Sequence, residues 1–138
     1  MRQPIMNRSS LGKAMLGFAI VATVAIVAIA DVFNASHLFN PDWPGHARFH
    51  IGMQFTTLVL VSLFSLAALR RGQVWASALA PASFWPGLFV AYLIPGTDVY
   101  ASESLRELGI PINLLLAAVL LGITGLGALL YQSSERPA

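Results

Sequence analysis

The stretch LGKAMLGFAIVATVAIVAIADVF, from Leu11 to Phe33, decides the fold class of this chain. Apart from Lys13 near its start and Asp31 near its end, it contains only apolar and small residues and one threonine. A helix of this length extends about 34 Å at 1.5 Å per residue, enough to cross the roughly 30 Å hydrocarbon layer of a bilayer. The stretch therefore predicts a transmembrane helix.

The end of this stretch has a second interpretation, because Ala28-Ile29-Ala30 places small residues two positions apart just before Asp31. That pattern is typical of the cleavage site of a secretory signal peptide. The apolar run is longer than the roughly 7–15 residues of a signal-peptide core. We therefore interpret it as a membrane span and keep cleavage as the alternative.

Three further apolar stretches predict helices over residues 46–69, 74–94 and 112–131, which gives spans of about 11–33, 46–69, 74–94 and 112–131. The chain of 138 residues is 57% hydrophobic and 10% charged, whereas soluble domains carry roughly 25% charged residues. The absence of cysteine excludes disulfides and thiolate metal sites. We expect an all-α, four-helix transmembrane bundle that forms a single membrane domain over residues 1–138.

Two of these segments carry residues that affect helix shape and packing. Pro81 and Pro86 lie inside the third segment, and a proline removes a backbone donor and kinks a helix, so this segment is predicted to bend. In the fourth segment Gly122, Gly125 and Gly127 lie close together, which favours close approach of another helix.

The basic residues predict the orientation, because cytoplasmic loops of membrane proteins are enriched in lysine and arginine. With both termini in the cytoplasm, the cytoplasmic side would hold six basic residues and the opposite side two. The six are Arg2, Arg8, Lys13, Arg70, Arg71 and Arg136, and the two are Arg48 and Arg106. We expect a multi-pass protein of a bacterial inner membrane, in contact with lipid and not with nucleic acid, that is free to form homo-oligomers.

Polar residues concentrate in DVFNASHLFNPDWPGHARFHIGMQ, from Asp31 to Gln54. They recur at every third position early in this stretch and then at every fourth position, which is one stripe of a helix. The recurring residues are Asp31, Asn34, His37 and Asn40, followed by His46, His50 and Gln54. Ionisable side chains at a membrane boundary are costly unless they are paired or hydrated, so this stretch is the candidate functional site.

One hypothesis is a divalent metal site. His46 and His50 have the i, i+4 spacing at which two imidazoles on one helical face bind one ion. His37, Asp98 or Glu103 would complete the ligand set, with Asp31 as a further candidate. The structural alternative is that these imidazoles hydrogen-bond to water, carbonyl groups and the nearby Asn and Asp side chains.

The other hypothesis is metal-free acid–base chemistry on a lipophilic molecule, since histidine exchanges protons near neutral pH. In this interpretation His37, His46, His50 and Asp31 are the catalytic groups. The substrate-binding groups would be Asn34, Asn40 and Gln54 for a carbonyl or hydroxyl, Arg48 for an anionic headgroup, and Trp85 in an aromatic wall with Phe84, Phe89 and Tyr92. Each of two parts has an alternative that stays open. The aromatic residues could instead be plain core packing, and Arg48 could instead pair with Asp42.

The residues from Asn34 to His50 also carry a motif, N-x-x-H-x-F-N-P-x-W-P-x-H-A-x-F-H. It resembles the signature of a family of small four-helix membrane proteins from bacteria and fungi. The architecture is loosely similar to DoxX-like, sterol-isomerase-like and anthrone-oxygenase-like membrane proteins. The resemblance implies the four-helix membrane architecture and carries over no activity and no residue role.

The sequence thus favours an integral membrane protein that binds or transforms a lipophilic small molecule at a His, Asp and Asn site near the extracytoplasmic face. A non-catalytic membrane subunit, in which the same motif is structural, is one alternative. A metal-dependent membrane oxidoreductase is the other.

Overall fold

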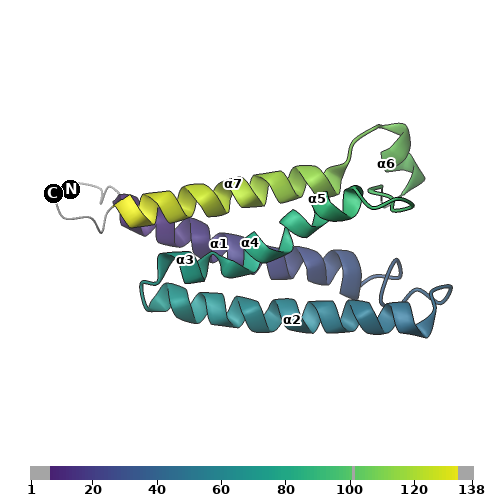
Figure 1. Ribbon diagram of the computed structural model, residues 1–138, viewed down its shortest axis with the longest axis horizontal. Coiled ribbons are helices and arrows are strands. Elements are labelled where there is room, and N and C mark those ends of the chain that lie inside the picture. The colour runs from purple at the N-terminus through teal and green to yellow at the C-terminus, as the bar shows by residue number, and fades with distance from the viewer. Residues whose placement is uncertain (1–6, 101, 134–138) are drawn as a thin grey trace, which may run out of the picture.

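The computed structural model describes residues 7–100 and 102–133, and within these ranges all regular structure is helical (Figure 1). Arg2 and Arg136, which enter the charge argument, lie outside the described residues. The helices are α1 (Arg8–Val27), which continues into a π-helical turn (Ala28–Val32), α2 (Gly45–Arg70), α3 (Val74–Ser77), α4 (Leu79–Phe84), α5 (Pro86–Tyr92), α6 (Glu103–Glu107) and α7 (Ile112–Ser133).

Three of the helical segments are long and apolar enough to cross a membrane: Arg8–Val32, Gly45–Arg70 and Ile112–Ser133. They match three of the four predicted spans to within a few residues, and they confirm the all-helical prediction. Large apolar side chains such as Phe18, Phe64 and Leu129 are more than half exposed. Exposed side chains of this kind are what a lipid-facing helix surface requires.

The segment predicted to be one bent helix over residues 74–94 consists of three short helices, α3, α4 and α5, with breaks at Ala78 and Trp85. The break at Ala78 lies three residues before Pro81, and the break at Trp85 lies directly before Pro86. Pro81 and Pro86 cannot donate to the carbonyl groups four residues earlier, so the helical hydrogen bonding is interrupted twice. The three pieces together still run lengthwise beside the long helices (Figure 1).

A side chain from α2 enters the first of these breaks. The hydroxyl of Ser65 accepts a hydrogen bond from the Ala80 N–H at 3.1 Å and lies 3.5 Å from the Ala76 carbonyl oxygen. These two backbone groups would bond to each other in an unbroken helix. Ser65, which is fully buried, therefore takes the place of a helical hydrogen bond and ties α2 to the broken segment.

Helices α1 and α7 approach each other most closely at two glycines. A Cβ atom added at Gly12 would lie 2.5 Å from the Tyr131 nitrogen and 2.6 Å from the Gly127 oxygen, both backbone atoms. Gly127 thus has the packing role predicted for it. By contrast, a Cβ atom added at Gly122 or Gly125 would meet nothing within 4 Å, so these two glycines are not part of the close approach.

Trp85 anchors the junction of α4 and α5 in the core, where it packs with Ala117 and Leu120 of α7. Its indole Nε1 donates to the Thr23 hydroxyl of α1 at 2.8 Å, and that hydroxyl donates to the Ala19 carbonyl at 2.7 Å. Trp85 and Thr23 are almost fully buried. The hydrogen-bond chain joins the broken segment to α1, and the packing of the Trp85 ring joins it to α7.

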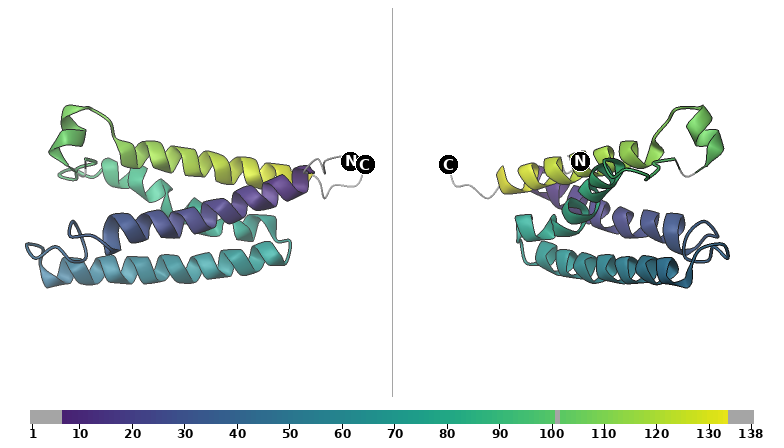
Figure 2. Two further views of the ribbon diagram at one scale, coloured as in Figure 1. Left: turned by 180° about the vertical axis from the view of Figure 1, so that it is seen from behind. Right: turned by 45° about the vertical axis from the view of Figure 1, so that its right-hand side comes forward.

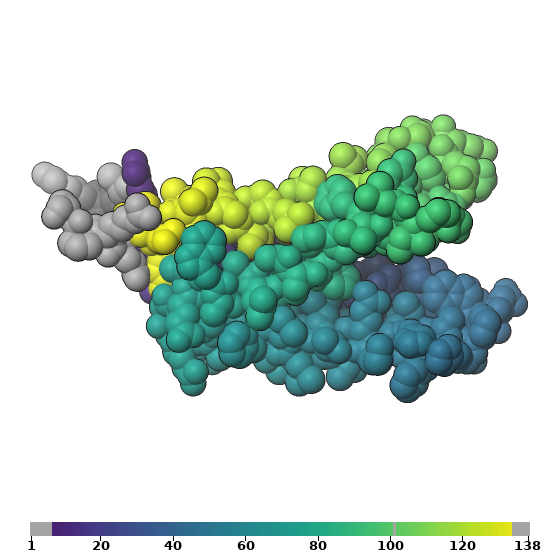
Figure 3. Space-filling model, viewed as in Figure 1, coloured from purple at the N-terminus to yellow at the C-terminus, as the bar shows by residue number. Residues whose placement is uncertain are grey.

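The helices separate toward the end that holds the turn between α1 and α2 (Figure 2). The start of α1 and the end of α7 pack together at the opposite end (Figure 2). From there α7 and α5 diverge from α1 and α2, and the space-filling view shows a hollow between α5 and the first half of α2 (Figure 3). The histidine-containing stretch lies at this open end.

Candidate functional site

The connection from α1 to α2 begins with the π-helical turn that carries Asp31. The Asp31 carboxylate Oδ1 lies 3.7 Å from His37 Nδ1, which is close enough for charge attraction but too long for a hydrogen bond. The hydrogen-bond partner of that imidazole nitrogen is the Ser36 hydroxyl, at 2.6 Å. The His37 and Trp43 rings also meet edge to face, with centroids 5.2 Å apart. Asp31, Ser36 and His37 thus form one polar cluster.

Asn34 and Asn40 hold this connection in shape. Asn34 Nδ2 donates to the carbonyl groups of Ile29 and Ala30 within the π turn, and its Oδ1 accepts from the Ser36 N–H at 2.7 Å. Asn40 Nδ2 donates to the Ser36 carbonyl at 3.2 Å, and its Oδ1 accepts from the Asp42 N–H at 2.9 Å. Both ends of each amide, predicted to orient a substrate, are therefore engaged by the loop itself.

His46 and His50 form a second, separate pair on the first turns of α2. Their Nε2 atoms lie 3.0 Å apart, and the two rings meet edge to face with centroids 4.5 Å apart. A hydrogen bond between two imidazole nitrogens requires one to carry hydrogen and the other a lone pair, so the neutral pair holds its rings in opposite tautomers. A further proton on the acceptor would break this bond.

The described residues contain no group of three or more His, Asp and Glu side chains that is able to hold a metal ion. His37 lies in the cluster with Asp31, apart from His46 and His50. Two imidazoles alone supply half of a tetrahedral coordination shell, so a metal at His46 and His50 would need its remaining ligands from water or a bound molecule.

Asp98 and Glu103, the other predicted metal ligands, are engaged in the loop between α5 and α7. Both accept hydrogen bonds from the Arg106 guanidinium, Glu103 Oε2 at 3.1 Å from Nε. The Tyr100 N–H donates to Asp98 Oδ1 at 3.1 Å, and this backbone bond, together with Arg106, holds the pKa of Asp98 below its ordinary value. Glu103 and Arg106 belong to the short helix α6 of this loop.

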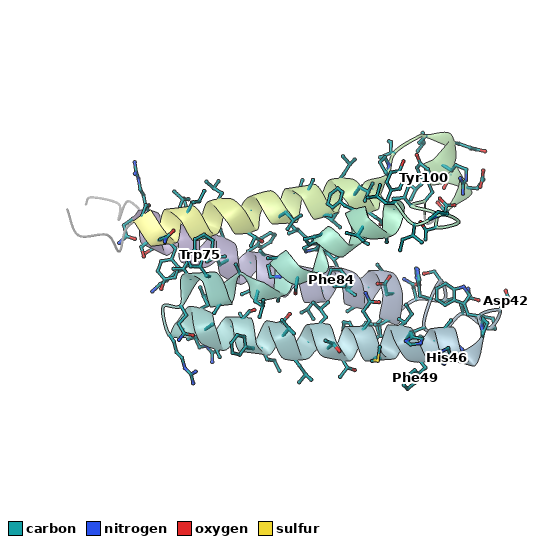
Figure 4. The ribbon with its side chains drawn as sticks, viewed as in Figure 1. Asp42, His46, Phe49, Trp75, Phe84 and Tyr100 are labelled. Atoms are coloured by element: carbon teal, nitrogen blue, oxygen red, sulfur yellow. The ribbon has the colours of Figure 1, made fainter. Side chains whose placement is uncertain are left out.

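A pocket of about 430 Å³ lies between α2 and α4. Two of the predicted site residues, His50 and Gln54, line it. Trp85, predicted to bind substrate, is absent from its wall because it is buried in the core, whereas its neighbour Phe84 lines the pocket (Figure 4). The other lining residues are Met53, Thr57, Leu58, Val61 and Ser83.

Sequence reasoning missed the continuation of this wall along α2. His50, Gln54, Thr57 and Val61 recur at steps of four, three and four, which is the spacing of one helical face. The stripe identified from the polar residues ended at Gln54, because Thr57 and Val61 are ordinary residues of a membrane helix. The extension is visible only once α4 supplies the opposite wall.

Arg48, the remaining predicted site residue, forms no ion pair with Asp42 or with any other residue in the described parts of the chain. Its Nε atom is buried and has no hydrogen-bond partner. Arg48 lines a different hollow, which adjoins the His50 pocket because Met53 and Thr57 line both. The site residues thus fall into five places: the Asp31–His37 cluster, the His46–His50 pair beside the pocket, the Arg106 loop, the Arg48 hollow and the core around Trp85.

The resemblance of the motif from Asn34 to His50 to a family of four-helix membrane proteins stays a prediction. No family model matches the chain, and neither the curated proteins nor the solved structures contain a match to it.

Proposed function

We propose that this chain is an integral membrane protein that binds a lipophilic small molecule in the pocket between α2 and α4. The three long apolar helices support the membrane location, because only a bilayer gives their exposed apolar side chains a favourable surrounding. The broken segment from α3 to α5 is then the fourth crossing. Its interrupted backbone is tolerable within a membrane because it packs against the long helices, whose side chains bond to the freed backbone groups. Ser65 of α2 accepts from the Ala80 N–H at the first break in this way.

The proposed orientation places both termini in the cytoplasm and the open end of the bundle on the other side. At the end opposite to the open one, where the start of α1 meets the end of α7, the described basic residues are Arg8, Lys13, Arg70 and Arg71. At the open end they are Arg48 and Arg106, and Arg106 is neutralised by two carboxylates. This asymmetry is the one that positive-inside topology favours.

The pocket is the observation that carries the binding proposal. Its volume of about 430 Å³ lies within the roughly 300–1,000 Å³ of small-molecule sites. Four of its eight lining side chains are apolar and four carry polar groups, so it offers both an apolar surface and hydrogen-bonding groups to a ligand. The side-chain amide of Gln54 makes no hydrogen bond to another described residue, so it is free for a ligand carbonyl or hydroxyl. The imidazole of His50, already paired with His46, supplies a second polar contact.

The chemistry of the pocket sets the test. A long-chain ketone and the alkane of equal length differ only in the oxygen that Gln54 or His50 would bind. We expect the full-length protein in nonionic detergent to bind the ketone about tenfold more tightly than the alkane, which corresponds to one hydrogen bond of about 1.4 kcal/mol. Gln54→Leu should raise the Kd of the ketone about tenfold, to that of the alkane.

His37→Ala is the matched control, because His37 lies in the other polar cluster and does not line the pocket. It should leave the preference for the ketone unchanged. Equal binding of ketone and alkane by the unaltered protein, or an equal loss in Gln54→Leu and His37→Ala, would refute the proposed site. Isothermal titration of both compounds provides the measurement.

A non-catalytic membrane subunit is the second candidate, and the bonds of Asn34 and Asn40 favour it. These amides shape the loop, since the oxygen and the nitrogen of each already hydrogen-bond to its backbone. If the whole motif serves the same purpose, His46→Ala and His50→Ala should lower the yield of folded protein in detergent. Under the binding proposal both variants fold and only ligand affinity changes.

A further inference from the structure

Two arginines lie at the open end of the molecule, in opposite electrostatic situations. Arg106 donates to Asp98 and Glu103, so its charge is compensated within the protein. Arg48 pairs with no acidic residue in the described parts of the chain, and its Nε atom is shielded from solvent without a hydrogen-bond partner. Arg48 as a whole is only half-buried, so an acceptor from outside the chain is able to reach its guanidinium, and such an acceptor would offset the cost of an unpaired charged donor.

Arg48 lies at one end of a long hollow of about 770 Å³ on the face of α2 that carries Phe49. Phe49 points away from the rest of the bundle (Figure 4) and is 64% exposed. The walls beyond Arg48 are built mainly from Leu38, Phe39, Phe49, Gly52, Met53 and Thr56. Thr56 donates its hydroxyl to the Gly52 carbonyl of its own helix, so the hollow offers few free polar groups away from the arginine.

The hollow therefore joins one cation to an apolar channel. From Arg48 to Thr56 it extends about 12 Å along the helix axis at 1.5 Å per residue. Nothing lies within 4 Å of a Cβ atom added at Gly45 or Gly52, so the surface is open beside the arginine. Arg48 is three residues into a membrane-length helix, which is the level of lipid headgroups.

We propose that this hollow, the Arg48 groove, binds one anionic phospholipid, with its phosphate on the guanidinium and an acyl chain against α2. A guanidinium suits phosphate because its planar donors bind two oxygens at once. The rest of the groove needs an apolar occupant, which a free anion does not supply. The proposal goes beyond ligand binding in the His50 pocket and depends only on membrane insertion.

Native mass spectrometry of the full chain in nonionic detergent tests the groove, with phosphatidylglycerol and phosphatidylcholine of identical acyl chains as the probes. We expect one phosphatidylglycerol to stay bound and phosphatidylcholine to be lost. Arg48→Gln should weaken phosphatidylglycerol binding about tenfold, to the level of phosphatidylcholine. Arg48→Lys should retain part of the preference, because it keeps the charge without the planar donor pair.

Arg106→Gln is the matched control, since that arginine is already paired, and it should bind phosphatidylglycerol as the unaltered protein does. Gly52→Phe fills the groove while leaving Arg48 in place, and it should also release the lipid. This second variant keeps the test decisive if Arg48→Gln fails to fold, which circular dichroism reports.

Several outcomes would overturn the proposal. Undiminished phosphatidylglycerol binding in folded Arg48→Gln or Gly52→Phe would do so, as would equal retention of the two lipids or an equal loss in Arg106→Gln. Displacement of the lipid by millimolar inorganic phosphate would identify a free-anion site instead. A lipid-free dimer that Gly52→Phe dissociates would show that a second copy of the chain covers the groove.

Discussion

Gly12→Ala is expected to destabilise the protein through the contact between α1 and α7. The added Cβ atom would lie 2.5 Å from the Tyr131 nitrogen and 2.6 Å from the Gly127 oxygen. Both are backbone atoms of a helix, so neither is able to rotate away. The only relief is separation of the two helices.

The size of the effect follows from these distances. Non-bonded heavy atoms are attracted most at about 3.5–4.0 Å, so the helices must move apart by about 1 Å at this point. That movement loosens the contacts of neighbouring buried residues, among them Leu16 and Tyr131. Overpacking of this kind usually costs about 1–3 kcal/mol, which we expect for the free energy of unfolding.

Titration with SDS in mixed micelles, followed by circular dichroism, measures this free energy. Gly122→Ala is the matched control, because it makes the same substitution in the partner helix where nothing lies within 4 Å of the new atom. Alanine has the higher helix propensity, so the control should be neutral or more stable by up to about 1 kcal/mol. Equal unfolding free energies for the two variants would refute the close approach of α1 and α7.

Three further outcomes follow from the structure. Thr23→Val removes the acceptor of a buried indole and should cost about 1–2 kcal/mol in the same SDS titration; an unchanged free energy would contradict that bond. The Asp98 pKa lies below its ordinary 3.8, so its contacts stabilise the loop above that pH and weaken as pH falls through the lowered pKa. The Tyr100 amide resonance should therefore titrate with a midpoint below 3.8, and Asp98→Asn should abolish the transition. Because the chain has no cysteine, single cysteines report topology: in intact cells an impermeant maleimide should label Ala35→Cys and not Ser10→Cys, and the reverse pattern would contradict the orientation.

The long helices were predictable from sequence because their length and apolar composition are local properties. The predicted spans 11–33, 46–69 and 112–131 agree with Arg8–Val32, Gly45–Arg70 and Ile112–Ser133 to within three residues. Pro81 and Pro86 also signalled an irregular third segment. The extent of its breaks was not predictable, because it depends on Ser65, a residue of another helix that bonds to the freed backbone.

The candidate site was predictable only where it depends on helical spacing. The i, i+4 relation brings His46 and His50 together as expected. The hydrogen-bond partners of the loop residues depend on how the chain turns back in each loop, and the spacing of residues in the sequence does not determine this. Asn34 and Asn40 bond to their own loop, and Asp98 and Glu103 bond to Arg106 and not to a histidine. Trp85 turns into the core because Thr23, far away in sequence, accepts its N–H.

Photo-cross-linking tests the binding pocket most directly. A long-chain ketone with a diazirine beside its carbonyl would be irradiated with the full-length protein in lipid nanodiscs, and the labelled peptides would be identified by mass spectrometry. The pocket predicts that the label falls on residues 50–61 of α2 and on Ser83 and Phe84 of α4, and that excess unlabelled ketone suppresses it. Labelling spread over the lipid-facing sides of α1 and α7, or unaffected by the competitor, would contradict a ligand site between α2 and α4.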